Sequence, residues 1–370
     1  MTRCVHRAPA GESGYSLIEL LVSTAIMVTV TGAIFSLMNP AQGNAQTQPE
    51  VADMQQRMRV GNETLFKEFV MAGAGPYQGA VTGSLVNFFA PILPRRIGRL
   101  NPDAATVFRD DTITLTYIPN TYSQTTISGA MPNTSAELKV TPQPNCPADG
   151  DQLCGFEDGM DVIIFDTSGN FDLFTVTKSQ DAAAHLQHRG QEELSKAYDV
   201  GAHVTQIVSN TFYLNTQTHQ LMRYNGGDND VPLVDNVVDL KFEYFGEINP
   251  PKLPKPPADP PQANCLYDVN GNYAAGLPTL SPDNGSLAAL PKAMLIDGPM
   301  CGGGASQFDA DLLRIRKVRV TMRMQAANPS LRGSDTTLFR NPGTSRGGER
   351  FVPDYTISFE VAPRNLNLTR

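Results

Sequence analysis

Two histidines, His185 and His188, stand three residues apart in the segment DAAAHLQHRGQEELSKAY, which we expect to be helical. On a helix this spacing places both rings on one face, where they could bind a metal ion. A solvated helix face carries such a pair more often than a metal site does. The chain also has only 5 His and 5 Cys among 370 residues, so we predict no metal site and no cofactor.

Two other segments offer oxygen ligands, but neither has the order of a calcium-binding loop. Asp228 and Asp230 lie in GGDNDVP, and Asp268 begins DVNGN, where Gly271 comes too early for that loop. Calcium binding stays an open alternative. The sequence has no P-loop, no H-E-x-x-H and no G-x-S-x-G. We therefore predict that the protein is not an enzyme, with an exported enzyme of unrecognised site as the alternative.

The only basic cluster comprises Arg314, Arg316, Lys317, Arg319 and Arg323. The net charge of the chain is −8, whereas nucleic-acid-binding proteins usually present a basic face. We expect no nucleic-acid partner. The cluster is predicted to lie on the solvated face of a strand, where it would also protect an open sheet edge. Contact with acidic neighbours or with DNA is the alternative.

The composition favours a turn-rich β protein with a real hydrophobic core. Apolar residues make up 41% of the chain and charged residues 18%, which excludes an intrinsically disordered protein. Glycine (31) and proline (28) are frequent, and tryptophan is absent. A helical bundle would have fewer turn residues.

A long apolar run lies close to the N-terminus. Residues 1–14 are polar and basic, and the following run Leu17–Met38 contains a single charge, Glu19, among 22 residues. A helix of that length spans about 33 Å, near the hydrocarbon thickness of a bilayer. The preceding basic residues predict that the N-terminus stays in the cytoplasm while the rest crosses. Asn39-Pro40 closes the run.

Three explanations of this run compete. A cleaved secretory signal would have a shorter apolar region, although Gly43-Asn44-Ala45 resembles a cleavage site. A simple signal anchor explains the length but not Glu19, because a carboxylate inside the apolar run costs about 2–3 kcal/mol. The third explanation gives this carboxylate a purpose.

The segment GYSLIELL at 14–21 resembles the processing site of type IV prepilins and type II secretion pseudopilins. The resemblance implies cleavage after Gly14 by a prepilin peptidase and methylation of the new N-terminal amine of Tyr15. Phe is more common than Tyr at this position. Glu19 becomes the fifth mature residue, and it is implied to meet the terminal ammonium of a neighbouring subunit. The buried carboxylate then gains a partner only when subunits assemble.

The resemblance also implies an organisation and a location. Residues 1–14 are the expected leader and 15–39 the transmembrane and assembly helix. The precursor is expected to be a single-pass protein of the inner membrane, with its C-terminal domain in the periplasm and its mature form in a pilus or pseudopilus. The implied partners are the prepilin peptidase, the inner membrane and other pilin or pseudopilin subunits.

A second helical pattern lies within residues 40–75. Apolar residues recur there at steps of three and four, namely Val51, Met54, Met58, Leu65 and Phe69, with Phe66 as a further candidate. Pro49 suits a first turn, and Gly73-Ala74-Gly75-Pro76 should end the helix. We expect a polar break between the membrane half and this amphipathic half, whose apolar stripe packs on a sheet.

Residues 76–370 are predicted to form a β-rich domain. Short strands are expected at 112–117, 162–165, 171–177, 203–208, 211–215, 220–224, 238–244, 318–324 and 355–361. The last three alternate apolar and polar residues, as in an antiparallel sheet with one face on a core. LVDNVVDLKFEYFG, then RIRKVRVTMRM, then a strand ending in APRN resemble the minor pilin PilW and pseudopilin J group. The predicted class is therefore α+β and pilin-like.

A proline-rich insertion at about 248–310 interrupts the strands, with seven prolines between Pro250 and Pro261. The cysteines outside the leader are Cys146, Cys154, Cys265 and Cys301, which permit three pairings. We favour Cys146–Cys154 and Cys265–Cys301, because each pair brackets a loop-like stretch and the N-terminus indicates export. Four free thiols in a cytosolic protein are the alternative.

Together these features predict a minor pilin of the PilW type that takes part in type IV pilus assembly, in a priming or tip complex. A large domain with an inserted loop is difficult to repeat in every layer of a tight filament. The alternatives are a type II secretion pseudopilin and a membrane-anchored exported binding protein or adhesin.

Overall fold

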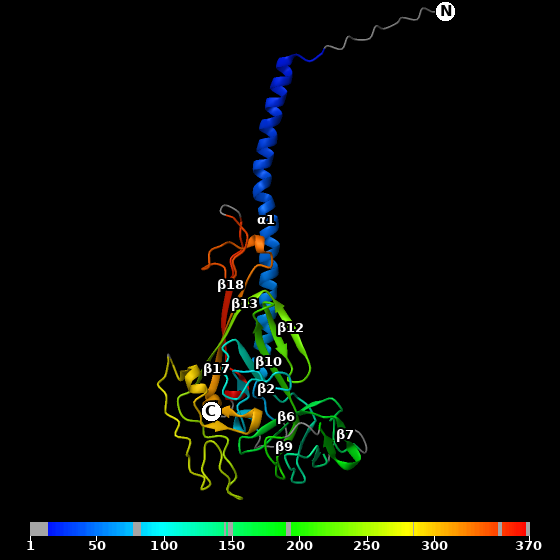
Figure 1. The fold of residues 1–370 in the computed structure, drawn as a ribbon, viewed down its shortest axis with the longest axis vertical. Coiled ribbons are helices and arrows are strands. Elements are labelled where there is room, and N and C mark those ends of the chain that lie inside the picture. Colours follow the sequence, from blue (N-terminus) through cyan, green and yellow to red (C-terminus); the bar gives the residue numbers. More distant parts are fainter. Residues whose placement is uncertain are drawn as a thin grey trace, which may run out of the picture.

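The computed structural model describes residues 14–76, 83–143, 146, 151–189, 194–283, 285–346 and 350–367, without the side chains of 39–44. A single helix, α1 (Leu17–Met71), projects far beyond a β-rich domain (Figure 1). All the strand pairs described are antiparallel. The expected α+β combination of an N-terminal apolar helix with mostly antiparallel sheets is confirmed. Residues 1–13 of the expected leader lie outside the described residues.

Helix α1 corrects one prediction. It runs without interruption for 55 residues through Pro40 and Pro49, where we expected a polar break and a new first turn. An interior proline removes one helical hydrogen bond but leaves the neighbouring turns intact. The second half of α1 packs on the sheets, and this packing stabilises the helix beyond Pro49. The helix ends at Met71, and Gly73 follows with a positive φ of 77°, as the glycine run predicted.

The described residues of the domain form five sheets. The first has the order β1 (Ile92–Leu93), β2 (Thr112–Tyr117), β10 (Val208–Asn215), β11 (Gln220–Tyr224) and β12 (Asp230–Asp235). The second has the order β14 (Leu287–Leu290), β13 (Val237–Glu247), β17 (Ile315–Met324) and β18 (Tyr355–Val361). The third has the order β3 (Gln124–Thr126), β9 (His203–Gln206), β5 (Asp161–Phe165) and β6 (Phe171–Thr175). The small sheets are β4 (Glu137–Lys139), β8 (His185–Gln187) and β7 (Lys178–Gln180), and β15 (Met300–Cys301) with β16 (Phe308–Asp309).

Short 3-10 helices lie in the connections. Their bounds are η1 (Leu85–Asn87), η2 (Asp181–Ala183), η3 (Lys292–Leu295), η4 (Gly304–Ser306), η5 (Ala310–Arg314), η6 (Pro329–Leu331) and η7 (Arg364–Asn367). The predicted strands match this pattern closely. The segment around His185 is the exception, because it forms β8 rather than the expected helix. Its backbone pairs with β4 and β7, and this pairing outweighs the local helical composition.

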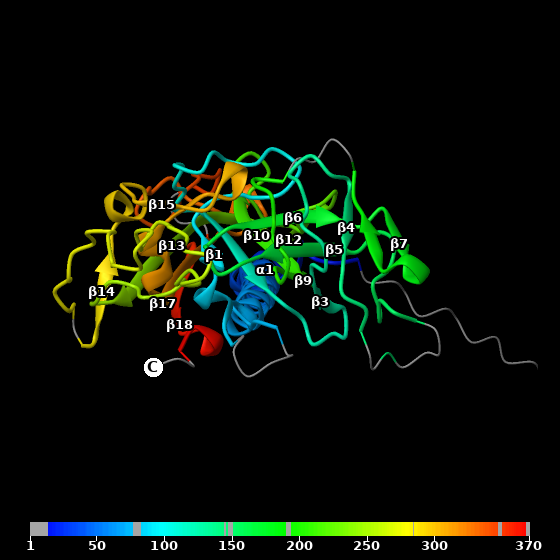
Figure 2. The ribbon, with the colours of Figure 1, turned by 90° about the horizontal axis from the view of Figure 1, so that it is seen from below.

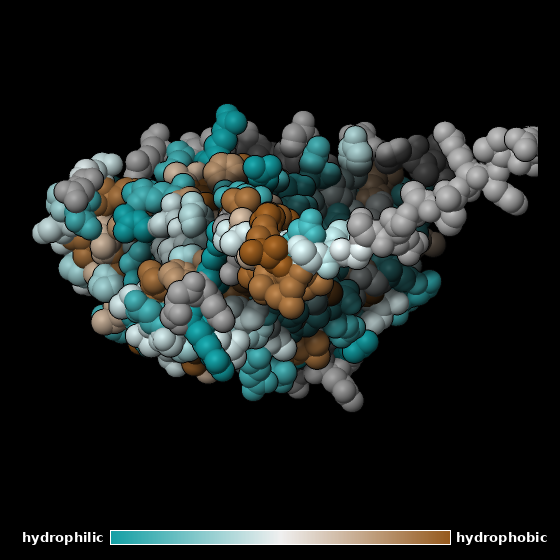
Figure 3. Space-filling model, turned by 90° about the horizontal axis from the view of Figure 1, so that it is seen from above, coloured by the Kyte–Doolittle hydropathy of each residue, from teal (hydrophilic) through white to brown (hydrophobic). Residues whose placement is uncertain are grey.

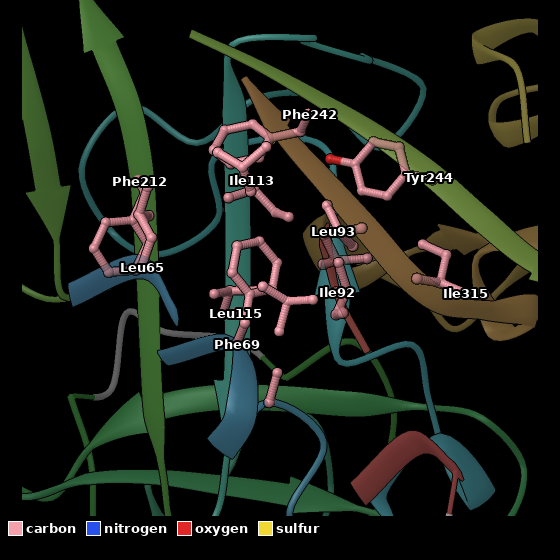
Figure 4. Packing of buried hydrophobic residues seen from close by; sticks show 14 of the residues in the cluster. Leu65, Phe69, Ile92, Leu93, Ile113, Leu115, Phe212, Phe242, Tyr244 and Ile315 are labelled. Carbon is pink, nitrogen blue, oxygen red and sulfur yellow. The ribbon is translucent and has the colours of Figure 1, made fainter. Parts of the chain in front are cut away.

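The main core lies between α1 and the first two sheets. Leu65 and Phe69 of α1 point toward Leu115, Phe212 and Phe242 from three different strands (Figure 4). Both α1 residues are fully buried, and Met54 and Met58, about three and two turns before Leu65, are buried as well. The predicted stripe is therefore the packing face, except that Phe66 is exposed.

One glycine permits this close packing. A Cβ atom on Gly61 would lie 3.0 Å from Cε of Met322 in β17 and 3.4 Å from Cγ2 of Val234 in β12. Both neighbours are themselves buried, so a larger side chain at this position would push α1 away from the sheets.

A second core was not foreseen from the sequence. It lies beneath the third sheet and the β4–β8–β7 sheet, and it contains Val162, Ile164, Leu186 and Val204. Strand β5 joins the two cores, because its other face places Ile163 and Phe165 in the main core. Both of its faces are buried, which explains its continuous apolar sequence.

We predict that Phe69→Ala lowers the free energy of unfolding of the domain by about 3–5 kcal/mol, because it removes a fully buried ring whose centre lies 6.3 Å from that of Phe242. Phe66→Ala is the matched control, since Phe66 lies one turn away on the same helix and is 49% exposed. Denaturant unfolding of the full chain in detergent measures both. Equal losses would contradict the packing described.

Candidate assembly site

The first half of α1 is uncovered. The segment Leu17–Met38 reaches a mean hydropathy of 2.1 over 18 residues, and none of it is buried within the chain. Seen along the helix from its N-terminal end, apolar side chains gather at the centre of the molecule, above a mainly polar domain (Figure 3). The segment is long and apolar enough to cross a membrane. Only a bilayer or the helices of other proteins would remove this surface from water.

Ser16 and Glu19 form a capping box at the start of α1. The Ser16 N–H and hydroxyl donate to Oε2 of Glu19 at 2.9 and 3.0 Å, and the Glu19 N–H donates to Oγ of Ser16 at 3.3 Å. The carboxylate thereby satisfies groups that would otherwise lack partners at the helix start. Glu19 also lies in the first turn, where the helix dipole favours a negative charge.

The expected cleavage position lies just before this cap. Gly14, Tyr15 and Ser16 precede the helix, and Tyr15 is 89% exposed. The Gly14–Tyr15 peptide bond is thus open to an enzyme. The role of Ser16 was missed in the sequence, although the spacing S-x-x-E directly before an apolar run is a recognised signal. The geometry brings Tyr15, Ser16 and Glu19 together at one exposed helix end.

No protein-family model matches this chain, and no curated protein is similar to it in sequence.

The cysteines pair as their spacing favoured. Cys146 bonds to Cys154, with Cα atoms 5.1 Å apart, and Cys265 bonds to Cys301, with Cα atoms 4.9 Å apart. Cys154 and Cys301 are buried. The second bond lies within the proline-rich insertion, and both of its cysteines pack in or against the main core. Two disulfides indicate an oxidising compartment such as the periplasm.

The insertion is more ordered than the sequence predicted. Its β14 strand pairs with β13, and Leu266, Leu290 and Leu295 enter the main core. Two fully buried arginines donate hydrogen bonds to backbone carbonyl groups of the insertion. Arg95 donates to the carbonyls of Ala305 and Gln307, and Arg314 donates to those of Ile248 and Pro278 at 3.0 and 2.8 Å.

The basic cluster therefore does not form one solvated face. Arg314 and Arg316 are buried, which corrects our prediction for these two residues. Lys317 and Arg319 both bind Glu360, at 2.8 and 2.6 Å, as expected for residues on a wet strand face. Arg323 binds Asp354 at 2.9 Å. Each cation of the cluster thus has a carboxylate of the same chain as a partner.

The polar pairs suggested by the sequence also have partners within the chain. His185 contacts Glu137 at 2.8 Å, while His188 packs on Phe174 with ring centres 5.2 Å apart. Asp228 binds Arg99 at 2.7 Å, and Asp230 binds Arg96 at 3.0 Å. Asp268 accepts the backbone N–H groups of Asn270 and Asn272 within its own loop.

An acidic cluster that the sequence analysis missed lies beside Arg314. Carboxylate oxygens of Asp297, Asp309 and Asp311 lie within 4.8 Å of one another. Nε of Arg314 is 2.5 Å from Oδ1 of Asp311, and both side chains are buried. Burial raises the pKa of the Asp311 carboxyl to about 6, although the charge of Arg314 opposes this shift. The D-x-D-x-x-R spacing at 309–314 is the signal in the sequence.

We predict that Asp311 makes the domain less stable as the pH rises from about 4 to about 6. The folded-state pKa of about 6 exceeds the ordinary value of 3.8, so the folded chain binds more protons within this window. Urea unfolding between pH 4 and 7 measures the free energy of unfolding. Its decrease with rising pH should be present in the wild type and absent in Asp311→Asn.

Asp335→Asn is the control for this prediction. Hydrogen bonds from Thr337 lower the pKa of Asp335, so its contribution is lost as the pH falls, the opposite direction. Parallel pH profiles for the wild type and Asp311→Asn would contradict the prediction.

Proposed function

We propose that this chain is a minor pilin of the PilW type, which takes part in type IV pilus assembly within a priming or tip complex. In this proposal the leader is removed after Gly14, Tyr15 is methylated, and α1 leaves the bilayer to pack against the helices of other subunits. The chain acts by assembly and catalyses no reaction.

The observation that carries the proposal is the uncovered half of α1 with a single carboxylate at its end. A plain anchor needs the 22 apolar residues but not Glu19. A bundle of staggered helices uses both, because a neighbouring terminal ammonium can reach a carboxylate one turn inside the apolar segment. Such a pair also fixes the register between helices, since any other stagger leaves both charges without a partner.

The capping box provides hydrogen-bond donors for this carboxylate before assembly. In the isolated chain Glu19 is bound to Ser16, so the helix start is stable before any partner arrives. Assembly would exchange these hydrogen bonds for a charged amine or share the carboxylate with it. A pair with the ammonium adds attraction between opposite charges to the hydrogen bond, which favours this partner in a site without water.

The bulk of the domain supports a tip or priming position. Two cores and a folded insertion lie at the end of α1, and they extend to both sides of the helix axis (Figure 2). A subunit of this width is difficult to repeat in every layer of a narrow filament. The same residues suit a type II secretion pseudopilin, which loss of pili or loss of secretion in a deletion strain would distinguish.

We predict that the protein from native membranes begins at a methylated Tyr15. Mass spectrometry of the intact N-terminal peptide measures this directly. A chain that begins at Met1 would indicate an anchored surface protein without this processing. A chain that begins near Gln46 would indicate ordinary secretion.

We also predict that Glu19→Gln reduces recovery of other subunits with the chain by about 10-fold or more, because the variant loses a charged pair in an apolar environment. Glutamine still completes a capping box, so the helix start is preserved. Ser16→Ala is the matched control, since it weakens the cap by about 1 kcal/mol and keeps the charge. Equal effects of the two variants in pull-downs of the detergent-solubilised complex would assign Glu19 to capping alone.

A further inference from the structure

Strand β18 is an open edge of the sheet that packs on α1. It is the last strand in the order β14–β13–β17–β18. All seven of its residues pair with β17 in one continuous register, from Val318 opposite Val361 to Met324 opposite Tyr355. Among the described residues, no backbone hydrogen bond joins its other side to a further segment. That side presents unpaired N–H and C=O groups to the surroundings.

The other sheet edges in the described part of the chain are protected. They are short, from two residues in β1 to six in β12. The six-residue edge contains Pro232 and a register shift against β11, and both features discourage a further strand. Strand β18 is longer, and its sequence YTISFEV has no proline, no lysine and no register shift. This edge lacks the usual protection against pairing with another chain.

Half-exposed apolar side chains lie beside this edge. Tyr355 is 53% exposed, and Ile357 and Phe359 are only partly buried, on the face of β18 that continues the core. On α1, Phe66 is 49% exposed and Val70 36%.

This flank of α1 faces the β18 side of the domain. Nδ2 of Asn365, in η7 shortly after β18, donates to the carbonyl of Val70 at 3.2 Å. Strand β12 lies on the opposite side of the helix (Figure 1). An added strand would therefore bury one row of its side chains against α1 and β18.

The polar face of the sheet adds a charge pattern to this edge. Near Glu360 the charges balance, because Lys241, Lys317 and Arg319 share Glu243 and Glu360 and the charge of Asp283 also acts on Arg319. Near Thr356 the face is negative, because Arg323 lies between Asp354, which it binds, and the exposed Asp239 opposite it in β13. One end of β18 is therefore negative on this face, which complements a strand with a basic residue at that end.

We propose that β18 accepts a β-strand from a neighbouring subunit of the assembly, so that the sheet continues from one subunit into the next. The incoming strand has at least five residues without proline and apolar side chains toward α1. On its polar face a basic residue lies near Thr356. Main-chain hydrogen bonds supply the affinity, and the side chains select the partner.

The inference rests on the proposed function, because the partner is taken to be a subunit gathered around α1. The uncovered apolar half and the half that packs beside β18 belong to one continuous helix. A subunit that packs along the upper half is thereby directed down the same axis toward Phe66 and β18. The two contacts form one continuous interface rather than two separate ones.

Hydrogen exchange of the β18 amides tests the proposal in the full chain. The chain is measured alone in detergent and again within the complex recovered from native membranes. The β18 amides that point away from β17 should exchange at least about 100-fold more slowly in the complex, since each gains a backbone partner. Docking of side chains alone would leave these amides without a hydrogen bond.

Matched lysine variants complete the experiment. Thr356→Lys places the natural edge-protecting residue on β18, at an exposed position opposite Arg323. It should reduce recovery of the partner subunit by about 10-fold, because it also repels the expected basic residue. Val231→Lys, at a 37% exposed position on the β12 edge, should have no effect.

The outcomes separate this inference from the proposed function. An intact complex with unchanged β18 exchange, or equal recovery with both lysine variants, overturns strand addition and leaves subunit assembly standing. If no other subunit is recovered with the wild-type chain, the proposed function is overturned and strand addition with it. Protection of β18 together with selective loss in Thr356→Lys supports the proposal.

Discussion

Burial of the second half of α1 is the interaction on which the rest of the structure depends. Met54, Met58, Leu65 and Phe69 enter a core that two sheets complete, and Gly61 lets β12 and β17 approach the helix. Because the helix is continuous, this packing also fixes the direction of the uncovered apolar half. The domain thus holds a long apolar rod away from itself and leaves it available to a bilayer or to other helices.

Two buried arginines of the domain have partners within the same chain. Arg95 and Arg314 are fully buried, and each donates hydrogen bonds to carbonyls of the insertion. The insertion is therefore part of the packed core. Glu19 is different, because among the described residues it binds Ser16, three residues earlier at an exposed helix end. A carboxylate that caps its own helix in an apolar segment can exchange that role for a stronger, charged partner.

The exposed sheet edges differ in how readily they accept another strand. The short or bulged edges of the other sheets cannot readily accept a strand, whereas β18 is long, regular and bordered by the exposed flank of α1. Apolar surface left open in a secreted or anchored protein usually marks a contact. The open helix and the open strand lie along one side of one axis, so a single set of neighbours could cover both.

The sequence by itself determined the elements and their faces. The 22-residue apolar run, the stripe from Met54 to Phe69 and the alternating strands are local patterns, and each is read directly from side-chain periodicity. The disulfide pairing also followed from spacing. The capping box at Ser16 was readable in the same way, although we did not recognise it.

Only the tertiary structure decided how these elements combine. Contacts between residues far apart in the chain determine three features that local composition does not predict. These are the burial of Arg314 and Arg316, the second core and the strand at His185. The continuity of α1 through two prolines likewise depends on packing beyond Pro49. Whether a strand is central or at an edge depends on the order of the whole sheet, so the open edge of β18 became visible only in the folded domain.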